Sequence, residues 1–122
     1  MRAAKLIKYG GFKVWSDFFD SKEIIRMENV PVYGAAYVVT LFKLYDMSIR
    51  TGGILNIESR LAADGYIRYL AEECKTNIPF MDRAMSYYLQ HGFAKIDEKG
   101  EDVKIHFPYV EDNLITWDET EG

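Results

Sequence analysis

Four side chains that suit contact with nucleic-acid bases recur along one face of a predicted helix. These side chains are Arg83, Ser86, Tyr87 and Gln90. They lie three, four and seven residues apart, which is the spacing of one side of an α-helix. An arginine can pair bidentately with guanine, and a glutamine can do the same with adenine. We therefore expect this face to enter the major groove of duplex DNA as a recognition helix.

The helix that must present these side chains is predicted over Pro79–His91. Proline fits the first position of a helix, where its missing N–H costs nothing, and Gly92 is suited to follow a helix end. The apolar residues of the segment fall on the opposite side, and they are Met81, Ala84, Met85 and Tyr88. The pattern therefore predicts a helix anchored inward by these residues, with its arginine-bearing side toward solvent.

A second helix is predicted just before it, over Gly65–Lys75, because its apolar residues recur at helical spacing. Asp64 can cap its start, and Thr76-Asn77-Ile78 turns the chain between the two helices. Arg68 and Lys75 belong to this first helix, from which phosphate contacts usually come. The two helices together predict a helix-turn-helix.

A β-hairpin is predicted after the helices, from strand-like segments at Phe93–Ile96 and Val103–Phe107. Residues 98–101 form the turn, in which Gly100 is free to take a positive φ. The hairpin carries three further candidate contacts to the DNA backbone, Lys95, Lys99 and Lys104. Acidic residues oppose them, namely Asp82 on the helix face and Glu98, Glu101 and Asp102 near the hairpin tip. Helix-turn-helix plus hairpin is the plan of a winged helix, so we expect a mainly α domain with a small β-sheet.

The rest of the chain supplies a predicted scaffold. Tyr33–Ile49 is apolar on nearly every side, which predicts a central helix. Ile54–Ile57 is expected to form a short strand that pairs with the hairpin. A short helix is expected to be capped by Asp20, with Glu23 three residues later. Its expected buried side consists of Ile24, Ile25 and Met27.

Charge is unevenly distributed along the chain, whose formal net charge is −4. Four Lys or Arg residues precede the first acid, Asp17, whereas five acids and no Lys or Arg follow Phe107. We divide the chain into a basic arm (1–11), a winged-helix domain (12–107) and an acidic tail (108–122). Opposite charges at the two ends favour electrostatic partners or simply promote solubility.

Other chemistries find little support in the sequence. The single cysteine, Cys74, lies on an apolar stripe, and it forms no recognisable metal-ligand set with His91 and His106. We expect His91 to cap a helix end or lie exposed. We find no nucleophile or phosphate-binding motif, and therefore predict neither an enzyme nor a bound cofactor or metal. No segment has the character of a signal peptide or a membrane span, which favours a cytoplasmic protein without membrane partners.

Several stretches resemble the N-terminal domain of phage replisome organisers and, less closely, that of DnaD-type primosome proteins. The matching stretches are Phe18–Ile24, Gly34, Leu41–Leu44, Thr51–Leu55, Tyr69–Ala71, Met81, Ala84-Met85 and Gly92–Asp97. The resemblance spans roughly residues 12–107. It implies a winged helix that assists initiation of DNA replication, by binding the origin or by helping to load the helicase. It also implies that the chain self-associates into an oligomer.

The sequence is also compatible with other functions. The near-neutral body and acidic tail also fit a protein-interaction module, whose partner is a helicase, another replication protein, a host protein or a second copy of the chain. Because folds host many functions, a transcriptional regulator is a further alternative. The tyrosines around the motif, Tyr66, Tyr69, Tyr87 and Tyr88, could stack on single-stranded bases, although most are expected to be core or rim residues.

Overall fold

The computed structural model describes residues 6–14 and 17–119. Its helices are α1 (Lys22–Glu28), α2 (Gly34–Ser48), α3 (Tyr66–Glu73), α4 (Ile78–Gln90) and α5 (Pro108–Asp112), with short 3-10 turns η1 (Phe18–Asp20) and η2 (Ile49–Thr51). Its strands are β1 (Leu6–Phe12), β2 (Ile54–Ile57), β3 (Lys95–Asp97), β4 (Val103–His106) and β5 (Leu114–Glu119). The prediction of a mainly helical chain with a small antiparallel sheet is confirmed.

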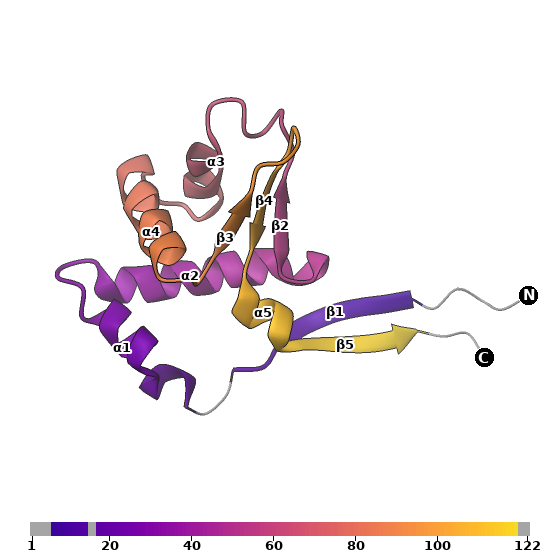
Figure 1. Cartoon of the computed structure of the whole chain (residues 1–122), viewed down its shortest axis with the longest axis horizontal. Helices are drawn as coiled ribbons and strands as arrows, with labels where there is room; N and C mark the ends of the chain where they lie inside the picture. The colour runs from indigo at the N-terminus through magenta and orange to yellow at the C-terminus, as the bar shows by residue number, and fades with distance from the viewer. Residues whose placement is uncertain (1–5, 15–16, 120–122) are drawn as a thin grey trace, which may run out of the picture.

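Helix α2 is the centre of the fold, as its apolar sequence predicted. Leu41, Leu44 and Tyr45 are fully buried on it and belong to a single hydrophobic core. Figure 1 shows α2 crossing the molecule, with α3, α4 and the three-stranded sheet gathered along one side of it. The helix ends at η2, after which Gly52 takes a left-handed conformation that turns the chain into β2.

Helix α1 packs against the start of α2. Ser21, rather than the predicted Asp20, caps α1, because η1 takes up Asp20 and moves the helix start along the chain. Ile24 and Met27 are buried, but Ile25 is 44% exposed, so its predicted burial is wrong. Successive residues of a helix point about 100° apart, and the buried stripe of this short helix does not reach Ile25.

Helices α3 and α4 lie where two helices were predicted, and a short turn joins them. The side chain of Asn77 accepts a hydrogen bond of 2.8 Å from the Phe80 amide, so α4 begins at Ile78, one residue before the predicted Pro79. The predicted cap of α3 by Asp64 is wrong. Gly65, with φ 96°, occupies the cap position, and no side chain bonds to the helix start there. Asp64 therefore lies one residue before the N-cap position of α3.

The three-stranded sheet has the order β2-β4-β3 and is antiparallel throughout, so the predicted pairing of β2 with the hairpin is confirmed. Strand β3 starts at Lys95 instead of Phe93. The amides of Phe93 and Ala94 both donate to the Tyr88 carbonyl, which ties this stretch to the end of α4. Gly100 does not adopt the positive φ that its place in the turn had suggested.

A second sheet of two strands joins the ends of the described chain. Strand β1 pairs antiparallel with β5, from Leu6 opposite Glu119 to Phe12 opposite Leu114. Helix α5 leads into β5 and contributes Val110 to the core. Figure 1 shows this ribbon projecting beyond the helical body. The segments expected to be a basic arm and an acidic tail therefore lie side by side over residues 6–12 and 114–119.

Among the described residues, no helix combines the length and the apolar character needed to cross a membrane.

Candidate nucleic-acid interface

The two sides of α4 differ sharply in exposure. Met81, Met85 and Tyr88 are almost completely buried, as predicted. The polar side chains on the other side are exposed, and they include Arg83, Ser86 and Gln90. Their spacing places three hydrogen-bonding side chains on one solvent-facing stripe about two helical turns long. We call these three residues the α4 stripe.

Tyr87 does not belong to this exposed stripe, which corrects the sequence prediction. Its ring is half-buried, with its centroid 5.7 Å from that of Tyr37 and 4.2 Å from that of His91. Its phenol oxygen is buried and finds no hydrogen-bond partner within residues 6–14 and 17–119. Burial raises the pKa of Tyr87, while the nearby charge of Arg26 acts to lower it. Tyr87 therefore packs against Tyr37 beside the α4 stripe, and its hydroxyl does not project into solvent.

Two neighbours of the α4 stripe were missed by the sequence analysis. The guanidinium carbon of Arg83 lies 5.9 Å from the ring centroid of Tyr33, within the range of a cation–π contact. Arg26 of α1 is exposed and close enough to influence Tyr87 electrostatically. Both neighbours come from parts of the chain far from α4 in sequence, so no local spacing could have indicated them.

The cations predicted on the first helix of the motif have different surroundings. Arg68 is exposed, but its Nε lies 3.5 Å from a carboxylate oxygen of Glu72, one turn along α3. Lys75 is exposed and follows the end of α3 with a positive φ of 56°. Arg68 therefore offers a partly neutralised charge, whereas Lys75 projects from the turn between the helices.

The hairpin cations lie on a different surface from the α4 stripe. Ile105 is fully buried and pairs with Ile96, so the residues on either side of them point to the opposite face of the sheet. Lys95 and Lys104 are exposed on that outer face. Because the sheet and α4 both turn their buried sides to one shared core, these two lysines do not extend the α4 stripe.

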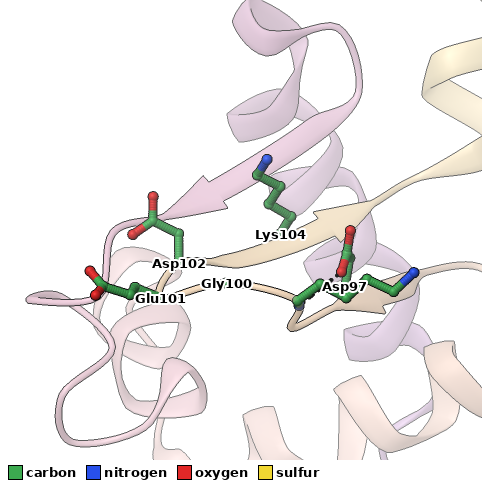
Figure 2. A pocket seen from close by; sticks show the side chains of 6 residues that line it. Asp97, Gly100, Glu101, Asp102 and Lys104 are labelled. Carbon is green, nitrogen blue, oxygen red and sulfur yellow. Dashed lines mark hydrogen bonds between the residues drawn. The ribbon is translucent and has the colours of Figure 1, made fainter.

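Carboxylates dominate the hairpin turn, where Lys99 lies. The turn surrounds a hollow of about 240 Å³ that is lined by Asp97, Glu101, Asp102 and Lys104. Figure 2 shows Asp102 and Asp97 on either side of Lys104, while Glu101 points away from it. Asp97 accepts a hydrogen bond of 2.9 Å from the Lys99 amide, which shapes the turn. A phosphate approaching this turn would meet more negative than positive charge.

The turn is also tied to neighbouring segments. Asp102 accepts a hydrogen bond of 2.9 Å from the Ser59 amide, which connects the hairpin to the loop after β2. Burial raises the pKa of Tyr66, and the carboxylates of Glu98 and Asp82 raise it further. Glu98 of the hairpin turn and Asp82 of α4 therefore both lie near Tyr66.

The remaining reactive side chains have structural surroundings. Cys74 is buried, and burial raises the pKa of its thiol, so the reactive thiolate is disfavoured. The Nδ1 atom of His106 lies 3.3 Å from a carboxylate oxygen of Glu111. His91 is exposed at the end of α4, as expected. Within residues 6–14 and 17–119, no group of three or more His, Cys, Asp or Glu side chains is placed to hold a metal ion.

No family model, curated protein or solved structure matches this chain.

Proposed function

We propose that the chain is a winged-helix DNA-binding domain of the replisome-organiser type, which assists initiation of DNA replication by binding the origin or helping to load the helicase. The observation that carries the proposal is the α4 stripe, on the second helix of a helix–turn–helix that an antiparallel hairpin follows. The assignment to replication is supported by the resemblance of residues 12–107 to replisome organisers.

The dimensions of the α4 stripe suit the major groove. Arg83 and Gln90 are seven residues apart, or about 10 Å along the helix, which matches about three base pairs of B-DNA. In the proposed complex Arg83 pairs with guanine, Gln90 pairs with adenine, and Ser86 bonds to a base edge between them. Arg26 then contacts a phosphate beside the groove.

The charges around α4 favour one approach of the duplex. The carboxylates of Asp82 and Glu98 both act electrostatically on Tyr66. Arg26 acts on Tyr87, and Arg83 lies over the ring of Tyr33. We therefore propose that the duplex approaches from the α1 side and leaves the hairpin turn uncovered. With few phosphate contacts, binding should be modest at physiological salt and should rise only gradually as salt is lowered.

Fluorescence anisotropy with labelled duplex DNA tests the proposal. The unmodified chain should bind with a salt-dependent affinity. Arg83→Ala and Gln90→Ala should each weaken binding to a selected site by about 1–3 kcal/mol, because each removes a bidentate base contact. The preferred site would first be obtained by selection from genomic fragments. Recovery of an origin supports the replication role, and recovery of promoters supports a transcriptional regulator.

Lys104→Ala is the matched control for Arg83→Ala, because it removes one exposed positive charge from the outer face of the sheet. It should change the affinity for the selected site much less than Arg83→Ala does. Equal losses of affinity from the two substitutions would show that binding depends only on the total charge of the chain. That result would reject the α4 stripe as the surface that contacts the bases. The absence of salt-sensitive binding would reject DNA binding itself.

A further inference from the structure

A groove lies between α2 and the turn that joins α3 to α4. Its volume is about 610 Å³, and it is the largest hollow described on this molecule. Helix α2 forms one wall through Ala36, Val39 and Lys43, and the opposite wall includes Lys75 from the turn and Phe80 from α4. The groove is distinct from the α4 stripe, with which it shares only Arg83.

The charges that line this groove are all positive. Lys43, Lys75 and Arg83 contribute to its walls, and none of the described residues that line it carries a carboxylate. The whole chain, by contrast, carries 19 acidic against 15 basic residues. The amine of Lys43 donates a hydrogen bond of 3.3 Å to the Cys74 carbonyl, which holds this charge at the boundary between α2 and the turn. A ligand for this surface should therefore be acidic.

The same surface is unusually apolar for an exposed one. Val39, which lines the groove, is 57% exposed, and Tyr33, which also lines it, is 40% exposed. Val32 and Ile78 are exposed next to lining residues in the sequence. These four account for almost half of the nine large apolar side chains described as exposed. Exposed apolar surface gathered in one place marks an interaction site more often than a solvated face.

Backbone conformation sets this region apart as well. Among the described residues, only two that are not glycine have positive φ, namely Val32 at 72° and Lys75 at 56°. This conformation is especially costly for a β-branched residue such as valine. Lys75 lines the groove, and Val32 immediately precedes Tyr33 at its edge. Strained backbone tends to be retained where it positions functional side chains.

The shape of the groove favours a helical ligand. Its walls come largely from two helices, and Ala35 and Ala36 on α2 leave room for a third helix to approach closely. An amphipathic helix that packs in such a groove buries its apolar side and keeps its polar side at the rim. A DNA backbone would match the cations but would leave Val39 and Phe80 without apolar partners. The combination of charge and apolar surface therefore favours a protein ligand.

We infer that this groove docks an acidic amphipathic helix of a partner protein. The apolar residues of that helix pack on Val39 and Phe80, and its carboxylates pair with Lys43, Lys75 and Arg83. The groove gives the domain a protein-binding surface in addition to the proposed DNA-binding stripe. Because Arg83 belongs to both surfaces, occupation of the groove by such a helix lowers the affinity for DNA.

A designed peptide tests the inference on the full chain. The probe is a fluorescein-labelled helical peptide of about 15 residues, long enough to hold a helix, with leucines on one side and glutamates on the other. The comparison peptide has the same composition in scrambled order, which keeps the charge and removes the apolar face. Anisotropy should show binding of the probe at least about tenfold tighter than binding of the scrambled peptide.

Paired variants locate the binding site. Val39→Ser should weaken probe binding by about tenfold, because it removes an apolar contact that the peptide would bury. Ile25→Ser, which changes an exposed apolar side chain on α1 away from the groove, should leave probe binding unchanged. Lys43→Gln should weaken binding severalfold at low salt, and Lys104→Gln should have much less effect. In ¹⁵N–¹H spectra, the probe should shift the amide signals of Val39, Lys43 and Thr76.

Several outcomes would overturn the inference. One is the absence of probe binding. Another is equal binding of the scrambled peptide, which would show that the interaction depends on the net charge of the peptide and not on an apolar face. Equal losses from Val39→Ser and Ile25→Ser would place the peptide elsewhere. If duplex DNA shifted the same groove amides and Val39→Ser did not affect the probe, the groove would be assigned to nucleic acid. None of these results depends on whether the α4 stripe binds DNA.

Discussion

At the scale of single residues, two buried tyrosines make opposite use of their hydroxyl groups. The rings of Tyr45 and Tyr88 are both fully buried, and burial raises the pKa of each phenol. The Tyr88 hydroxyl donates to the backbone carbonyl of Tyr37 and so connects α4 to α2. The Tyr45 hydroxyl has no hydrogen-bond partner among the residues that the structure describes. The phenol hydroxyl therefore stabilises the folded state at Tyr88 and destabilises it at Tyr45.

Phenylalanine at each position tests this contrast. Tyr88→Phe should lower the free energy of unfolding by about 1 kcal/mol, because it removes a buried hydrogen bond. Tyr45→Phe should leave it unchanged or raise it by up to about 1 kcal/mol, because it removes an unpaired polar atom. Urea unfolding measures both changes. A loss from Tyr45→Phe as large as that from Tyr88→Phe would contradict the assignment.

At the scale of elements, the contact between α1 and α2 depends on the absence of a side chain. A Cβ atom on Gly34, the first residue of α2, would lie 2.1 Å from the Glu28 carbonyl oxygen at the end of α1. This distance is far below a normal contact, and the atom it meets belongs to the backbone. The two helices therefore approach as closely as they do only because glycine occupies this position.

Gly34→Ala tests the close approach. Helix propensity alone predicts a gain of about 1 kcal/mol from alanine. The clash should outweigh it and lower the free energy of unfolding by about 1–3 kcal/mol. Gly100→Ala is the control, since a Cβ there meets no atom within 4 Å, and its effect should stay within about 0.5 kcal/mol. Thermal unfolding that shows Gly34→Ala to be more stable than the unmodified chain would overturn the packing argument.

The elements that sequence reasoning predicted well are those with strong local signals. The apolar run of α2, the periodicity of α4 and the alternation of β4 each describe a buried surface, and that surface forms in the structure. Helix starts were misplaced by one residue, because Ser21 and Gly65 compete with Asp20 and Asp64 for the cap positions. The sequence alone does not decide which of two adjacent residues takes the N-cap position, since any short polar residue or glycine suits that position.

The features that escaped prediction all depend on contacts between distant parts of the chain. The pairing of β1 with β5 joins the two ends, and the β1 sequence includes Gly10-Gly11, which weakens its strand signal. The proximity of Arg26 to Tyr87 and the place of Lys43 in the groove likewise require tertiary structure. The exposure of the α4 stripe was predictable from periodicity, but the half-burial of Tyr87 depends on Tyr37 of α2.

At the scale of the whole molecule, different surfaces carry different chemistry. The α4 stripe offers hydrogen-bonding side chains with Arg26 beside it, the groove beside α2 joins cations to apolar surface, and the hairpin turn is rich in carboxylates. This separation matters more than the net charge of −4. An acidic chain can still bind DNA where its carboxylates lie away from the contact surface.

Chemical-shift mapping decides whether the α4 stripe contacts duplex DNA. The ¹⁵N-labelled full chain would be titrated with its selected duplex at low salt. The amide signals of Arg83, Ser86 and Gln90 should shift, together with that of Arg26. Those of Lys95 and Lys104, on the outer face of the sheet, should stay in place. Shifts confined to that outer face, or no shifts along α4, would contradict contact between the α4 stripe and DNA.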